Sequence, residues 1–270
     1  MAFEPGKAVV VTDVAHLAQY GRALRKVGKK IVVVPLSTGL HAGHIALIRA
    51  AKSMLGATVF VTYAGEEVPE EFAREGVDVV YHGALDAAGV QVRTGMDHLE
   101  DAGEVAAQVA RVIAAANATH ATDVVLGEKD FELLVAVQLA VTALRMEVKL
   151  HSVPTVRTPD GLAISLRNAR VPEEQREVAL ALSAALTAGA HAAEHGEAVV
   201  LQTARAVLEA AGVEPAYLAV RDLALRPAPE TGDARLMGAV DLAGVRLADN
   251  VGLPLGVGFK HIGDGEGPLR

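Results

Sequence analysis

Short runs of β-branched residues alternate with segments of helical periodicity through the first 155 residues of the chain. The clearest run is Ile31–Pro35 (IVVVP), which has the composition of a strand buried on both faces. We predict further strands at Thr58–Tyr63, Val77–Tyr81, Val124–Leu126 and Val148–Val153, and helices at His44–Leu55, Glu104–Ala116 and Phe131–Leu144. This alternation is typical of βαβ units with a parallel sheet, which binds ligands at the carboxyl ends of its strands.

The pattern changes after residue 159. Two alanine-rich helices are predicted at Pro172–Ala190 and Ala198–Ala211, and three strands follow at Tyr217–Arg221, Arg235–Leu242 and Val245–Val251. We therefore expect an α/β domain with a parallel sheet over residues 1–159 and a smaller α+β domain over residues 160–270.

Composition excludes several classes of protein. Hydrophobic residues make up 51% of the chain, which is enough for a packed core and excludes a disordered chain. The formal net charge of -8 lacks the positive field that attracts nucleic acid. There is no cysteine, and we see no targeting signal and no apolar run long enough to span a membrane. We predict a cytoplasmic protein that binds neither nucleic acid nor membranes and has no resident metal cluster.

The first candidate site is His41-Ala42-Gly43-His44, between the strand Ile31–Pro35 and the helix that follows it. Two histidines three residues apart at a helix start point the same way, and the free N–H groups of the helix add to the attraction for an anion. Gly43 allows a flat ring to approach the backbone. This arrangement favours a phosphate site, although two surface histidines at a helix N-cap give the same string.

Two further strings lie after later strands. In Gly127-Glu128-Lys129-Asp130 the lysine can meet a phosphate, and the aspartate can either bind Mg²⁺ or cap the next helix. In Ile164-Ser165-Leu166-Arg167-Asn168 the arginine can pair with two phosphate oxygens. Each string is weak evidence by itself.

Taken together and in their order along the chain, three segments resemble the pantothenate synthetase (pantoate–β-alanine ligase) family. They are PLSTGLHAGH (35–44), GEKDFELL (127–134) and HSVPTVRTPDGLAISLRN (151–168). YLAVRD (217–222) and VRLADNV (245–251) are similar to the family's second domain. The resemblance implies a Rossmann-like nucleotidyltransferase domain, a homodimer, and ATP with Mg²⁺ as cofactors. It also implies a two-step reaction, in which an acid and ATP form an acyl-adenylate and pyrophosphate, and an amine, β-alanine, then displaces AMP.

The resemblance also assigns residues. The catalytic group is His41, His44, Lys129, Ser165 and Arg167. The ATP-binding group is Ser37, Thr38, Gly39, Leu40, His41, Gly43, His44, Gly127, Glu128, Lys129, Asp130, Val156, Ile164, Ser165, Leu166 and Arg167.

The sequence departs from the family pattern in the acid-binding half. Two glutamines that bind pantoate in the family align with Val68 and Leu133, and the segment between His44 and Gly127 is shorter than in the family. Hydroxyl groups buried against apolar side chains lose their hydrogen bonds. Either another part of the short segment supplies new partners, or the acid is less hydroxylated than pantoate.

Two rival functions belong to other classes. A plain nucleotidyltransferase that passes AMP to a phosphorylated acceptor uses the same histidine motif, and a stable adenylylated product would indicate it. A non-catalytic ATP-binding protein would retain nucleotide binding without pyrophosphate exchange.

Overall fold

A computed structural model describes residues 4–85 and 89–258, which form two compact units divided between Glu173 and Glu174. The sequence analysis placed the boundary after residue 159. The later division has a structural reason: Arg157 pairs with Ala163 in a β-bridge, and the Asn168 side chain donates a hydrogen bond to the Ala163 carbonyl at 2.8 Å. Residues 160–173 thus belong to the first unit.

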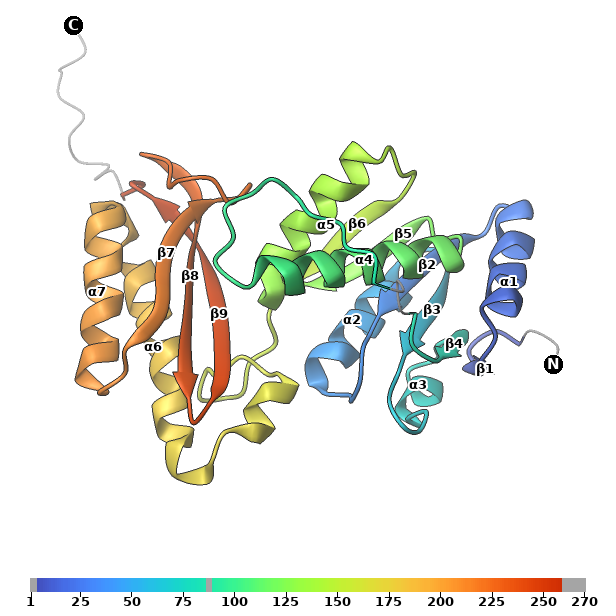
Figure 1. The fold of residues 1–270 in the computed structure, drawn as a ribbon, viewed down its shortest axis with the longest axis horizontal. Coiled ribbons are helices and arrows are strands. Elements are labelled where there is room, and N and C mark those ends of the chain that lie inside the picture. Colours follow the sequence, from blue (N-terminus) through green and yellow to red (C-terminus); the bar gives the residue numbers. More distant parts are fainter. Residues whose placement is uncertain (1–3, 86–88, 259–270) are drawn as a thin grey trace, which may run out of the picture. The chain divides into compact units, whose positions relative to one another are not determined.

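The first unit contains a sheet of six parallel strands in the order β1-β4-β3-β2-β5-β6 (Figure 1). The strands are β1 (Val9–Val11), β2 (Lys30–Pro35), β3 (Ala57–Tyr63), β4 (Val79–His82), β5 (Asp123–Gly127) and β6 (Lys149–Val153). Because β2 is followed along the chain by β3 on one side but lies beside β5 on the other, the strand order reverses at β2. The carboxyl ends of β2 and β5 form the topological switch point, where α/β sheets bind ligands.

Helices cover both faces of this sheet. They are α1 (Val14–Lys26), α2 (Ala42–Ser53), α3 (Glu71–Arg74), α4 (Ala102–Ala118) and α5 (Phe131–Ala143). Buried residues of α1, α4 and α5 pack with Val33 and Phe60 on one face. Buried residues of α2 and α3 pack with Val32 and Val61 on the other. Neighbouring positions on β2 and β3 therefore serve opposite cores, as the buried run IVVVP predicts.

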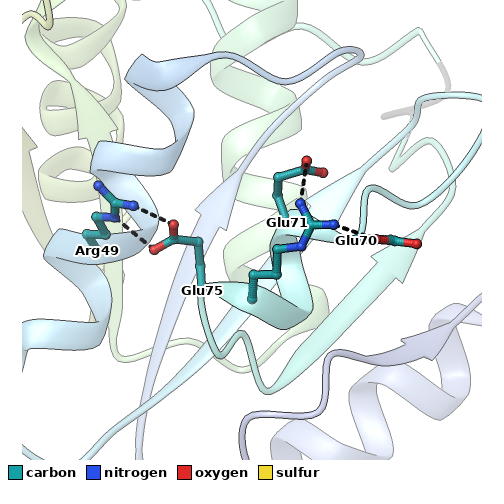
Figure 2. A network of polar contacts seen from close by, with 5 residues as sticks. Arg49, Glu70, Glu71 and Glu75 are labelled. Carbon is teal, nitrogen blue, oxygen red and sulfur yellow. Dashed lines mark hydrogen bonds and ion pairs between the residues drawn. The ribbon is translucent and has the colours of Figure 1, made fainter.

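On the second face, one ion pair joins α2 to the residue after α3, and two more lie within α3 and its N-cap (Figure 2). Arg49 of α2 donates two hydrogen bonds to the Glu75 carboxylate, at 2.8 and 2.6 Å, and Arg74 pairs with Glu70 and Glu71. Such exposed pairs each contribute about 0–1 kcal/mol to the free energy of unfolding. The buried cores, and not these pairs, account for the stability of the sheet.

The second unit is a three-stranded antiparallel sheet with two helices packed against it (Figure 1). Its elements are α6 (Arg176–His191), α7 (Glu197–Ala210), β7 (Pro215–Asp222), β8 (Gly232–Leu242) and β9 (Val245–Leu255). This arrangement is the α+β domain predicted from the sequence.

Every helix and strand that we predicted is present, with ends shifted by a few residues, but β1, α1 and α3 were not predicted. No helix in the part of the chain that the structure describes is long and apolar enough to cross a membrane.

Candidate functional site

A cavity of about 760 Å³ opens at the carboxyl ends of the parallel strands, and all of its lining residues belong to the first unit. One wall is built from the segments that follow β2, β5 and β6. A second wall comes from the helices α4 and α5, with Leu85 after β4. The switch point of the sheet thus coincides with the cavity, as parallel sheets of this kind predict.

His41 and His44 stand side by side on the first wall. Their rings stack with centroids 3.7 Å apart and an angle of 24° between the planes. His41 is the N-cap of α2, and its Nδ1 accepts a hydrogen bond from the backbone N–H of Gly43 at 3.1 Å. Because Nδ1 is the acceptor, the hydrogen of the neutral ring lies on Nε2, where it is available as a donor.

Both rings are neutral at physiological pH. Burial lowers the pKa of His44 to about 4, and the neighbouring His41 ring lowers it further, against the opposing effect of Asp130. Burial also lowers the pKa of His41, assisted by the charge of Lys129. The His44 Nδ1 atom is buried and has no hydrogen-bond partner among the described residues.

Lys129 and Asp130 follow β5 in a short 3-10 helix, Glu128–Asp130. The Lys129 side chain is 16% exposed, and its Nζ lies 3.8 Å from Asp130 Oδ1. Asp130 lines the cavity with a 62% exposed side chain and makes no capping hydrogen bond to α5. The capping role that we weighed for Asp130 is therefore wrong, and its carboxylate faces the cavity.

The segment 157–168 forms a tight loop at the same wall. Gly161 adopts φ +95° at its turn, and the N–H of Thr158 donates to the Leu162 carbonyl at 2.9 Å. The Ser165 hydroxyl donates to Asn168 Oδ1 at 2.8 Å. This loop brings Ile164, Ser165, Leu166 and Arg167 to the cavity, together with Val156.

Comparison with known proteins places the chain in a family. The sequence profile of the Pantoate-beta-alanine ligase family matches residues 9–75 and 69–252. The chain belongs to this family. The two matched stretches overlap at residues 69–75, in the segment between His44 and Gly127.

The relatives that the chain resembles are named pantothenate synthetases. The chain is 42% identical to a pantothenate synthetase of Corynebacterium jeikeium, across 98% of this chain and 96% of the relative. It is 38% identical to a pantothenate synthetase of Mycolicibacterium vanbaalenii, across 94% and 91% of the two chains. Among solved structures, a pantothenate synthetase from Thermus thermophilus aligns with a TM-score of 0.76 and 25% identity, over 90% of this chain and 98% of that one.

The resemblance to the ligase family assigned ATP-binding roles to several residues that do not line the cavity: Thr38, Gly39, Leu40 and Glu128. Gly39 has φ +70°, and a Cβ there would lie 2.9 Å from a methyl carbon of Leu166, so this glycine permits the loop after β2 to approach the loop 157–168. Glu128 accepts a hydrogen bond from the Ser152 hydroxyl at 3.0 Å. Gly39 and Glu128 thus lie next to residues of the cavity wall without lining the cavity themselves. The remaining ATP-binding positions, including Ser37 and Gly127, lie on the cavity.

The two positions expected in the acid pocket of a family ligase differ in their placement. Leu133 lines the cavity, but Val68 does not and instead packs against the core of α2 and α3. Along the segment that follows β3, Ala64 lines the cavity and Val68 does not.

Sequence reasoning missed the contribution of α4 to the site of this family member. Glu104, Gln108 and Arg111 line the cavity from this helix, with Val112 beside them. Their spacing of four and three residues puts them on one helical face, but we used only the apolar stripe of the segment. The polar residues next to that stripe were the available signal.

Buried histidine–carboxylate pairs were also missed. His98 Nδ1 lies 2.6 Å from Glu132, whose carboxylate also accepts the N–H groups of Leu99 and Glu100. Glu132 is buried in the first turn of α5. It therefore fixes the segment that precedes α4 against α5, which positions the α4 wall.

Proposed function

We propose that the protein is an ATP-dependent ligase that joins pantoate to β-alanine through a pantoyl-adenylate, with release of pyrophosphate and AMP. The observation that carries this proposal is the stacked pair His41 and His44 at the switch point, on a cavity shared with Lys129 and Arg167. Family membership supports the choice of substrates, because the relatives are pantothenate synthetases.

In the first step a carboxylate oxygen of the acid attacks the α-phosphorus of ATP, and the bond to the bridging oxygen of pyrophosphate breaks. Negative charge increases on the phosphate oxygens, so the chain's contribution is to position the groups and to neutralise this charge. His41 Nε2–H and the His44 ring donate hydrogen bonds, while Lys129 and Arg167 supply positive charge. Neutral imidazoles suit this role, since they donate without adding repulsion between the two stacked rings.

In the second step the uncharged amine of β-alanine attacks the acyl carbon, the bond to the AMP oxygen breaks, and the amine loses a proton. The same donors stabilise the departing AMP phosphate. Ser165 completes the phosphate contacts from the loop 157–168.

Mg²⁺ would bind at Asp130. A magnesium ion that accompanies ATP is held by one or two carboxylates and by phosphate oxygens, and Asp130 presents an exposed, uncapped carboxylate on the cavity. When bound, the ion neutralises charge on the departing pyrophosphate. No group of three or more His, Cys, Asp or Glu residues within 4–85 and 89–258 is arranged to hold a metal without the nucleotide.

The rival functions are less well supported. The apolar Leu133 favoured an acid with fewer hydroxyl groups, but relatives at 42% identity over nearly the whole chain are pantothenate synthetases, which favours pantoate. The same relatives disfavour a plain nucleotidyltransferase and a non-catalytic ATP-binding protein. The homodimer and the cytoplasmic location that we expected remain predictions.

The proposal is tested in two assays. The purified chain should exchange labelled pyrophosphate into ATP only when pantoate is present, and addition of β-alanine should yield pantothenate and AMP in equal amounts. Exchange that no acid stimulates, or an adenylylated product that β-alanine does not consume, would contradict the ligase.

A further inference from the structure

The polar face of α4 is the part of the cavity that the proposed mechanism does not use. Glu104, Gln108 and Arg111 occur along one side of the helix and line the cavity. α4 packs against α5, which contributes Leu133 and Leu134 to the same wall. The proposed mechanism assigns its phosphate contacts to other residues of the cavity.

A hydroxy acid needs hydrogen-bond partners on this wall. Most of the surface is hydrocarbon: Leu85, Val112, Leu133 and Leu134 offer neither donors nor acceptors. A buried hydroxyl left without a partner loses the hydrogen bonds that it makes in water, which weakens binding. Among the described residues that α4 and α5 contribute to the cavity, the polar ones are Glu104, Gln108 and Arg111.

The three side chains differ in what they offer to such an acid. The Gln108 amide both donates and accepts, which matches a hydroxyl group, and Gln108 is half-buried. The Arg111 guanidinium has five N–H donors and a positive charge that attracts an anionic acid. Glu104 and Arg111 are both exposed, but Glu104 carries the same charge as the acid, so it repels this substrate.

We propose that Gln108 and Arg111 of α4 bind the hydroxyl oxygens of the acid and determine its specificity in this protein. They take the place of hydrogen-bond partners that Leu133 does not supply. The inference rests on the proposed ligase function and extends it, since it names the residues that recognise the acid.

The test uses the acid-dependent half-reaction, pyrophosphate exchange into ATP without β-alanine. Gln108→Met and Arg111→Met keep the length and helix propensity of the side chains but remove their polar groups. We expect each to raise the KM for pantoate at least tenfold while the KM for ATP stays within twofold. Preference for pantoate over an analogue that lacks one hydroxyl should fall at least tenfold in one of the two variants.

Matched controls come from α1, where Gln19 and Arg22 are exposed, have the same spacing as Gln108 and Arg111, and do not line the cavity. Gln19→Met and Arg22→Met should leave both KM values unchanged. If Arg111→Met does not fold, Arg111→Lys, which keeps the charge but loses the planar fork, should still weaken the preference for pantoate.

The results separate the inference from the function on which it rests. Wild-type exchange with pantoate, combined with unchanged KM and unchanged preference in the α4 variants, would overturn the inference alone. An effect confined to the KM for β-alanine in the complete reaction would overturn it as well. Absence of pantoate-dependent exchange in the wild type would overturn both.

Discussion

The two walls of the cavity are built on different principles. The wall at β2 and β5 places its groups by backbone geometry: His41 is held by the N–H of Gly43, and Lys129 follows directly from β5. The wall at α4 and α5 is a helix surface, on which residues three and four positions apart share one face. The comparison teaches that backbone geometry places the groups of the first wall, whereas the second wall is defined by the side chains on its helix faces.

The largest expected effect is on the rate of adenylate formation, and it concerns the wall at β2 and β5, called here the phosphate wall. His44→Gln and Lys129→Ala should each lower the rate of adenylate formation at least a hundredfold, because a preorganised donor at a developing phosphate charge contributes about 3 kcal/mol. Single-turnover kinetics with ATP and pantoate measures this rate. The Gln19→Met variant serves as the control for expression and folding, and near-normal turnover in either site variant would exclude that residue from the reaction.

The position of the His41 ring should by itself affect the rate of adenylate formation. A Cβ at position 43 would lie 2.8 Å from His41 Cε1 and 2.9 Å from its Nδ1, so Gly43→Ala must displace the ring. Because misplacement of a catalytic group by about 1 Å can cost roughly a hundredfold, we expect a loss of roughly ten- to a hundredfold in adenylate formation. Alanine favours the helix itself, so the melting temperature should hold or rise. Full activity would mean that the His41 position is not critical.

The neutral state of His44 should make stability depend on pH. Its folded-state pKa of about 4 lies below the ordinary value of 6.5, so between these values the unfolded chain binds more protons and stability falls as the solution is acidified. After allowance for partial exposure, wild type should lose about 1–2 kcal/mol more than His44→Gln between pH 7 and pH 4.5. Urea unfolding of both proteins at the two pH values measures the difference. Equal losses would show that His44 is not buried as a neutral ring.

The smallest expected effect is on the KM for pantoate, and it distinguishes Leu133 from Val68, the two positions first assigned to the acid pocket. Leu133→Gln adds an amide to the cavity and should change the KM for pantoate at least threefold. Val68→Gln should leave that KM within twofold but lower the free energy of unfolding by about 1 kcal/mol, because the residue packs against a core. Steady-state kinetics and urea unfolding of both variants give the comparison. A change in the acid KM in Val68→Gln would restore the original alignment.

Most of the fold and the phosphate wall could be predicted from the sequence, but some elements could not. Helix α1 buries only Leu17 and Gly21, so its apolar stripe is too sparse to be recognised as a helix, and β1 has three residues. The pairs Glu132–His98 and Asp123–His151 join residues distant in the chain, with nitrogen–oxygen distances of 2.6 Å. Such pairs have no local spacing that would reveal them.

The sequence by itself determined the parallel sheet, the α+β second domain and the three strings at the phosphate wall. These features depend on neighbours along the chain: strand runs, helix starts and the residues that follow a strand end. Only the tertiary structure decided which side chains form the wall at α4 and α5, where Gln108 and Arg111 line the cavity and Val68 does not. The physical reason is that this wall is created by packing α4 on α5, so its members are selected by helix rotation and contact rather than by sequence proximity.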